Sequence, residues 1–398
     1  MARQTHETFI KNYDILKKIV GVIIMKDILK RLETVSDPRQ QCKVKHSIKD
    51  IVGIVLFATL ANANEWTEIN LFAEENEDFL RQYLDLPNGI PSHDTLSRVM
   101  GIIDPKFMQS LYLQWNNYIN TNEGEKIKKI LNIDGKTMRG SGNVNQKAFH
   151  VVSVWSDADG ISLGQKVVDE KSNEIIAIPE LLEEINIKGS IVTIDAMGTQ
   201  VKIAEQIKKQ KGNYVLAVKG NQGNLYEEIK TYFEDEEELK QIKEAGGYKR
   251  TAEKARSQIE VREYYQTAEI GWMKEKKRWK GLKSIGMVQN TITKSNGEKV
   301  IERRYYITSE PVDIELFAKS CRGHWAIESM HWHLDVTFKE DSNKTLEKTA
   351  NENLTIIRRW ALGILKTVEL STKKSSLKAK RYRICMNPQK YIREIMEV

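Results

Sequence analysis

The stretch Leu131 to Gly140, "LNIDGKTMRG", places an acid at the end of an apolar run and follows it at once with glycine and two cationic residues. An Asp-Gly pair after a strand is commonly a turn, because the Asp side chain bonds nearby amides and Gly tolerates positive φ. A second interpretation makes Asp134 a metal-binding carboxylate, which needs partner ligands elsewhere in the chain. The surrounding sequence bears on this choice.

Apolar runs around this stretch predict a mixed sheet. The strand-like runs "KILNID", "AFHVVSVW" and "ISLGQKVV" come first, and then a helix, the strand "SIVTID", a second helix and the strand "NYVLAVK". This β-β-β-α-β-α-β order is that of the ribonuclease-H-like fold, an α/β class with helices on the sheet faces. A charged helix and a basic, strand-rich stretch up to about Ile307 follow and predict a β-rich insertion.

Two of these strands end in the same way, "LNIDG" at Asp134 and "TIDAMG" at Asp195. The first and fourth strands are neighbours in this order, so we expect the two carboxylates to meet at one edge of the sheet. Their repulsion is removed by a hard divalent cation, and oxygen ligands suit Mg²⁺ or Mn²⁺ better than zinc. The pair favours the metal interpretation of Asp134 over the turn.

A third acid lies in "CRGHWAIESMHWHLDVTFKED", where His324, Glu328, His331 and Asp335 recur at i, i+4, i+7 and i+11 and share one helix face. One interpretation is a buried polar stripe. A di-iron bundle would need a second Glu-x-x-His helix, which the sequence lacks, and the absence of HExxH disfavours a zinc protease. The remaining interpretation makes Glu328 the third carboxylate of a two-metal site, where the other three residues orient ligands or face DNA.

Composition limits the class of protein. The chain has 398 residues and a net charge of +7, which is compatible with a polyanionic partner. Its three cysteines, Cys42, Cys321 and Cys385, show no CxxC spacing, which argues against a disulfide framework and a structural zinc site and favours a reducing compartment. The longest apolar run, 51–63, is shorter than the ~20 residues of a membrane span, so we expect a cytoplasmic protein with no membrane partner.

Changes in the spacing of apolar residues predict the domain organisation. Apolar residues at helical spacing from 43 to about 120 predict a helical N-terminal domain. Within it, "IPSHDTLSRVMGIIDPKFM" has the short helix, turn and helix of a DNA-reading element, although ordinary helical bundles share this succession. The expected domains are 1–124, helical and a candidate for binding DNA ends; 125–221, the first part of the catalytic core; 222–305, the insertion; 306–370, the rest of the core with the glutamate helix; and 371–398, a basic C-terminal tail.

Cationic residues near the acids and in the tail are the candidate DNA contacts. Each could neutralise a phosphate, and each alone is equally compatible with a solvated surface charge. The tail is the stronger signal, because 371–390 contains seven Lys or Arg and no Asp or Glu. The candidates are Lys136, Arg139, Lys219 and Arg322 beside the acids, and Lys373, Lys374, Lys378, Lys380, Arg381 and Arg383 in the tail.

The combined motifs "IPSHDTLSRV", "NIDGKTMRGS", "VVSVWSDADGISLGQ", "KSNEI", "TIDAMGTQ", "YVLAVKGNQ" and "HWAIESMHWHLDVTFKED" resemble the H-repeat-associated transposases of bacterial insertion sequences, a branch of the DDE transposases. The resemblance runs from about residue 30 to about 370. It implies a ribonuclease-H-like core whose catalytic, metal-binding acids match Asp134, Asp195 and Glu328, with Mg²⁺ or Mn²⁺ as cofactor. Its implied partner is double-stranded DNA, both transposon ends and target, bound by a homodimer.

The chain departs from the family pattern at two places. Similar proteins carry "HGRIE" in the insertion, whereas this sequence reads "ARSQIEVRE", which keeps Glu260 and Arg262 but lacks the His and the first Arg. This departure argues against a DNA or hairpin contact at that place. The N-terminal ~30 residues are longer than the pattern requires. The expected function is metal-dependent cleavage at insertion-sequence ends and strand transfer to target DNA. Two alternatives stay open: a catalytically lapsed DNA-binding descendant, and a nuclease that cuts without joining.

Overall fold

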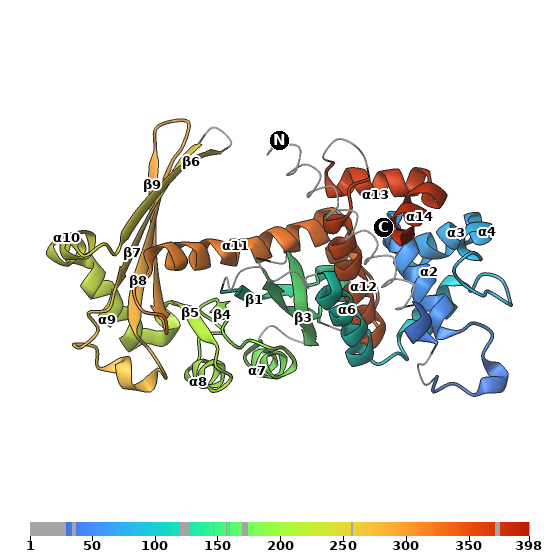
Figure 1. Ribbon diagram of the computed structural model, residues 1–398, viewed down its shortest axis with the longest axis horizontal. Coiled ribbons are helices and arrows are strands. Elements are labelled where there is room, and N and C mark those ends of the chain that lie inside the picture. Colours follow the sequence, from blue (N-terminus) through green and yellow to red (C-terminus); the bar gives the residue numbers. More distant parts are fainter. Residues whose placement is uncertain are drawn as a thin grey trace, which may run out of the picture.

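The computed structural model contains a mixed sheet flanked by helices and a helical region at one end of it (Figure 1). It describes residues 29–33, 37–119, 128–145, 147–156, 158, 160–168, 174–255, 258–370 and 375–397. Most of the extra N-terminal segment, and the predicted DNA contacts Lys373 and Lys374, lie outside these residues. No helix within them has both the length and the apolar character that crossing a bilayer requires.

A nine-stranded sheet, in the order β3-β2-β1-β4-β5-β9-β8-β7-β6, forms the centre of the fold. Its strands are β1 Ile130–Thr137, β2 His150–Ser156, β3 Ile161–Val168, β4 Ile191–Ile194, β5 Asn213–Val218, β6 Tyr248–Ala255, β7 Gln258–Thr267, β8 Ser284–Thr293 and β9 Lys299–Thr308. β1 runs antiparallel to β2 and parallel to β4, and β4 runs parallel to β5. The first five strands therefore confirm the predicted ribonuclease-H-like fold.

The strand-rich insertion extends this same sheet. β9 pairs antiparallel with β5, so that Val215 lies opposite Thr308, and β8, β7 and β6 follow outward. Helices α9 (Gly223–Glu234) and α10 (Glu236–Glu244) connect β5 to β6. In Figure 1 the four added strands rise as an arm at one end of the molecule. The arm and the core are thus joined by an unbroken ladder of backbone hydrogen bonds.

Helices cover both faces of the sheet. α7 (Glu174–Glu184) packs on β2 and β3, and α8 (Val201–Lys209) packs on β5. The glutamate helix α11 (Ile314–Val336) contacts β1, β4 and β5 of the core and β6 and β7 of the arm. Figure 1 shows it running along the sheet from the arm to the helical region. One helix therefore spans the parts that the sequence divided into core and insertion.

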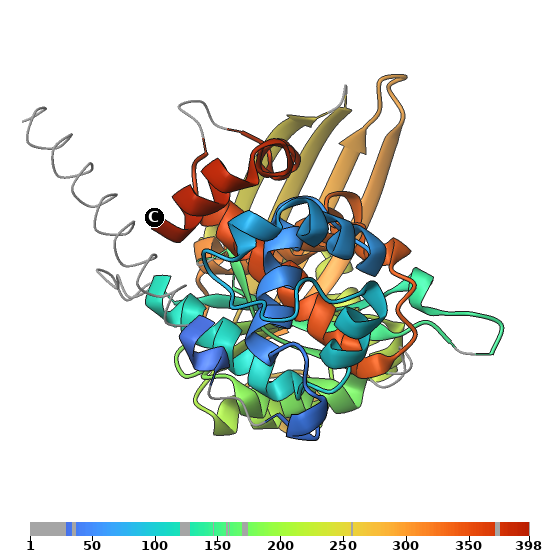
Figure 2. The ribbon, with the colours of Figure 1, turned by 90° about the vertical axis from the view of Figure 1, so that its right-hand side faces the viewer.

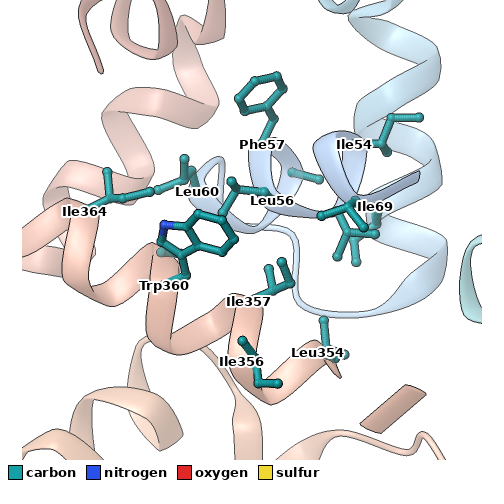
Figure 3. Close-up of a cluster of buried hydrophobic side chains, with 14 of the residues drawn as sticks. Ile54, Leu56, Phe57, Leu60, Ile69, Leu354, Ile356, Ile357, Trp360 and Ile364 are labelled. Carbon is teal, nitrogen blue, oxygen red and sulfur yellow. The ribbon is translucent and has the colours of Figure 1, made fainter. Parts of the chain in front are cut away.

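The helical region combines both ends of the described chain. Its N-terminal helices are α2 Ile48–Leu60, α3 Trp66–Glu75, α4 Glu77–Leu80, α5 His93–Met100 and α6 Pro105–Ile119, and its C-terminal helices are α12 Lys348–Thr367, α13 Leu377–Met386 and α14 Pro388–Glu397. α12 contacts α2, α5 and α6, and the two groups lie together in Figure 2. Figure 3 shows the shared core, in which Leu56 and Leu60 of α2 lie near Trp360 and Ile364 of α12. The predicted N-terminal domain is thus completed by C-terminal helices.

The candidate DNA-reading segment forms α5 and α6. Ser92 caps α5 by accepting a hydrogen bond from the amide of Thr95, and this is a favoured way to begin a helix. Leu96 and Val99 of α5 lie in the shared core, while Arg98 is exposed. Packing of this kind is typical of a helical bundle, and DNA reading by α5 stays a prediction.

The basic C-terminal segment is not an extended tail. It forms α13 and α14, and the Arg381 side chain, which is 0% exposed, lies inside the helical region. Its guanidinium donates hydrogen bonds to the carbonyls of Thr59 (2.7 Å), Ala63 (3.3 Å) and Thr337 and to Oδ1 of Asn64 (3.1 Å). Arg381 therefore ties α13 to the ends of α2 and α11, and its prediction as a DNA contact is wrong.

Lys380 has a similar role at the end of α12. Its Nζ donates to the carbonyls of Leu365 (3.0 Å) and Val368 (2.6 Å), and only 3% of the residue is exposed. A cation at these carbonyls also interacts favourably with the negative end of the helix. The prediction that Lys380 binds phosphate is therefore wrong too.

Replacing Arg381 with Ala should destabilise the fold by roughly 2–4 kcal/mol, because several buried carbonyls lose their donor. Arg383→Ala is the matched control, since Arg383 lies on the exposed side of the same helix and should change stability by less than about 0.5 kcal/mol. Urea unfolding of the two variants and the parent checks this. Equal midpoints for Arg381→Ala and the parent would contradict the role of Arg381.

Candidate active site

Asp134 lies within β1 and not at its end. Gly135 and Lys136 continue the strand and pair with Val152 and Val151 of β2, while Asp134 itself lies opposite Ser153. The expectation that the strand ends at Asp134 is therefore wrong, and so is the turn interpretation of the Asp-Gly pair. The carboxyl group instead projects from a strand whose backbone is fixed by its neighbour.

Gly135 is required by a close approach. A Cβ atom at this position would collide with Nε2 of His150 and Oε1 of Glu174, which contact each other beside the strand. His150 is 1% exposed and Glu174 is 4% exposed. The glycine after Asp134 thus makes room for a buried His–Glu pair, which no local sequence pattern revealed.

Asp195 is brought next to Asp134 by the parallel pairing of β1 and β4. The register places Ile133 opposite Ile194, and each acid is the next residue along the chain. Asp195 itself begins the loop after β4, where its Oδ1 accepts a hydrogen bond from the amide of Gly198 (3.0 Å). The two acids therefore occupy neighbouring positions on adjacent strands, as the sequence predicts.

Glu328, from α11, lies at the same cleft as Asp134 and Asp195. The three acids line one cleft of about 560 Å³, which is also lined by Lys219 after β5 and by cationic residues of β9. Glu328 is exposed, whereas Asp134 is partly buried. Residues that are far apart in the chain therefore meet around one open space.

The acids repel one another electrostatically. Burial, together with the carboxylates of Asp195, Glu174 and Glu328, raises the pKa of Asp134 to about 7, although the hydrogen bond from the Gly135 amide acts in the opposite direction. The acidic cleft therefore favours a proton or a metal cation.

The acids are arranged around an open cleft. Among the described residues, no three His, Cys, Asp or Glu side chains are placed so as to hold a metal ion by themselves. Mg²⁺ usually keeps several waters and takes few protein carboxylates together with substrate phosphate oxygens. Asp134, Asp195 and Glu328 fit this kind of ion, because they supply oxygen atoms only and leave space for other oxygen ligands.

His331 on α11 lies beside the first acid. Its Nδ1 is 3.5 Å from Oδ2 of Asp134. Burial, assisted by the charges of Arg359 and Lys136, lowers the pKa of His331 to about 3, so the ring is neutral near pH 7. Two residues of the predicted helix face thus lie at the site: Glu328 lines the cleft, and His331 contacts Asp134. The side chain of His324 lies outside the described structure.

Lys136 is not free to bind a phosphate. It is 9% exposed, and its Nζ contacts Asp335 and lies 3.0 Å from Oε2 of Glu340. Glu340 is fully buried and also pairs with Arg359 at 2.9 Å. The prediction of Lys136 as a DNA contact is therefore wrong. Glu340 belongs to the "FKED" stretch, but no local sequence pattern there predicts a buried network of charges.

The other predicted DNA contacts differ in exposure. Lys219 lines the acidic cleft, and Arg322 lies by another cavity of about 780 Å³ and pairs with Glu253 at 2.8 Å. Arg139 has an 85% exposed side chain beside Asp341. Lys378 and Arg383 are exposed on α13. These residues are exposed, unlike Lys136, Lys380 and Arg381, and DNA binding by them stays a prediction.

Two sequence families match the chain. The family described as Transposase DDE domain matches residues 125–364, and the family described as DDE_Tnp_1-associated matches residues 29–116. The first match contains all three acids of the cleft, and the second covers most of the N-terminal helices.

Several relatives align over most of the chain. It is 36% identical over 383 residues to "Putative transposase YncI" of Escherichia coli O157:H7, which covers 94% of this chain and 95% of that protein. It is 37% identical over 353 residues to "H repeat-associated putative transposase YhhI" of Escherichia coli strain K12, with 86% and 90% covered. A solved piggyBac transposase synaptic complex with hairpin DNA aligns with a TM-score of 0.40 and 11% identity, over 97% of this chain and 82% of that chain. The chain therefore belongs to the DDE transposase family, in the group that includes the H repeat-associated transposases.

Proposed function

We propose that the protein is an active transposase that cuts DNA at the ends of its insertion sequence and joins those ends to target DNA. The observation that carries this proposal is the convergence of Asp134, Asp195 and Glu328 on one cleft. When bound there, two Mg²⁺ or Mn²⁺ ions supply activation of the attacking oxygen and stabilisation of the leaving oxygen. No covalent protein intermediate is needed, so one site can serve cleavage and joining.

The three acids would hold the ions, and the elements around these acids fix the positions of their carboxylates. Asp134 is held by the pairing of β1 with β2, and Glu328 projects from a helix that packs on β1 and β4. The neutral His331 ring beside Asp134 limits the positions that this carboxylate can take. These groups come from rigid elements, which support precise placement of ligands.

Cationic side chains around the cleft would receive the DNA backbone. Lys219, Arg303 and Arg304 line it together with the acids. Arg303 is oriented by Gln289 (2.8 Å) and Arg304 by Glu302 (2.9 Å). Double-stranded DNA, at the element ends and at the target, is the proposed partner, bound by a homodimer in the cytoplasm. Phosphate contacts of this kind position DNA without reading its sequence.

Two other functions would use parts of the same structure. A lapsed transposase would bind DNA without cutting it, and "Inactive transposase YbfQ" of Escherichia coli strain K12 is 40% identical to this chain over 76 residues. The presence of all three acids around the cleft supports activity instead. A nuclease that cuts without joining would need the same acids, and inverted repeats flanking the gene would favour the transposase.

The substitution Asp134→Asn should lower Mg²⁺-dependent cleavage by roughly a thousandfold or more, because loss of a metal ligand removes several kcal/mol of transition-state stabilisation. Its stability should be equal or higher, since the variant relieves repulsion among the acids. The measurement is nicking of a supercoiled plasmid that carries the DNA flanking the gene. Asp78→Asn, at an exposed position on α4, is the control. Near-normal cleavage by Asp134→Asn would refute the assignment.

The substitution Lys219→Ala should weaken DNA binding and reduce the log-log salt slope by about one unit, as expected for one lost phosphate contact. Lys240→Ala, on the exposed surface of α10, should leave the slope unchanged. Fluorescence anisotropy with labelled duplex DNA at several salt concentrations gives both slopes. Identical slopes for Lys219→Ala and the parent would remove Lys219 from the interface.

A further inference from the structure

Asp195 lies in a loop, which makes its placement a separate structural problem. The parallel pairing of β4 with β1 and β5 ends at Ile194. Beyond it, the hydroxyl of Thr199 donates to the Asp195 carbonyl (2.9 Å), and the amide of Gly198 donates to its carboxylate (3.0 Å). These bonds shape the loop internally but do not attach it to the rest of the protein.

The attachment comes from the turn "KGNQ" that follows β5. Asn221 Nδ2 donates to the carbonyl of Ala196 (2.6 Å). Gln222 Nε2 donates to the same carbonyl (3.0 Å) and to that of Thr199 (2.8 Å). Two amide side chains thus hold both ends of the segment that follows Asp195.

The Gln222 side chain is itself fixed at both ends of its amide. Its Oε1 accepts a hydrogen bond from the backbone amide of Lys219 (3.4 Å), while both Nε2 hydrogens have acceptors. A flipped amide would face the Ala196 and Thr199 carbonyls with an oxygen, so the network specifies one orientation. Because β4 and β5 are parallel neighbours, the loops after them lie side by side.

We propose that Asn221 and Gln222 are positioning residues for the reaction, which hold the Asp195 carboxylate where it can bind a divalent ion. This inference rests on the proposed function, in which Asp195 is a metal ligand. Residues that orient metal ligands through hydrogen bonds commonly alter metal affinity or activity 10- to 100-fold when they are replaced. Lys219 and Gly220 of the same turn line the acidic cleft, so the turn borders the site that it would organise.

The test compares Gln222→Ala, Asn221→Ala and the full-length parent in Mn²⁺ titrations of plasmid nicking. Each variant should need roughly tenfold more Mn²⁺ for half-maximal rate, with an unchanged affinity for duplex DNA. Gln206→Ala is the matched control, because Gln206 also donates from its amide to a backbone carbonyl, that of Pro179 (2.8 Å), but on the helix beyond this loop. The control should keep the Mn²⁺ dependence of the parent.

Two further measurements separate positioning from a general structural effect. Gln222→Glu keeps the shape of the side chain but places oxygen against two carbonyls, so it should impair the Mn²⁺ dependence at least as much as Gln222→Ala. Hydrogen exchange of a peptide covering 195–200 should become faster in Gln222→Ala and stay unchanged in Gln206→Ala.

The results distinguish failure of this inference from failure of the proposed function. Unchanged Mn²⁺ dependence in Gln222→Ala and Gln222→Glu, with parental nicking that still requires Asp134, overturns only the positioning role. Nicking that survives both Asp134→Asn and Asp195→Asn overturns the proposed function, and the positioning role with it.

Discussion

The parallel pairing of β1 with β4 is the constraint on which the site depends. It fixes Asp134 and Asp195 at adjacent positions, although sixty residues of chain and two further strands intervene between them. Since neighbouring carboxylates in a partly buried place are unfavourable, the surrounding structure must hold them there by other means. The ladder to β2, the packing of α11 and the turn after β5 all contribute to this.

A second set of buried charges joins the sheet to the helical region. Burial alone would raise the pKa of Glu340, but Arg359 and Lys136 lower it to about 2, so the group is ionised. Arg359 also lies 3.3 Å from the hydroxyl of Ser153 in β2. Such a network is costly to break, because removal of one member leaves another buried charge without compensation. It connects β1, β2 and α12 just behind the acids.

The sequence allowed prediction of the features that depend on local pattern. Apolar runs and turn residues located the core strands, and the repeated Asp after two of them identified two of the acids that line the cleft.

The features that local pattern did not predict depend on contacts between distant residues. Asp134 was placed at a strand end because an acid interrupts the apolar run, yet pairing with β2 continues beyond it. The cations of α13 were taken as exposed because nothing local indicates that Arg381 meets carbonyls from α2 and α11. The strands of the arm were detected, but not their continuity with the core, since β9 meets β5 only after a long excursion of the chain.

The division of the helical region between the two ends of the chain has a consequence for how the protein folds. Its core needs α12 and α13 to cover α2, and all nine strands of the sheet lie between α2 and α12 in the sequence. Contacts at such sequence separation form slowly. During synthesis α3 and α5 can pack on α2 early, but the part of α2 that contacts α12 stays uncovered until α12 leaves the ribosome. Completion of this region is therefore a late event, and a nascent chain that stops before α12 would expose apolar residues of α2 that the native fold buries.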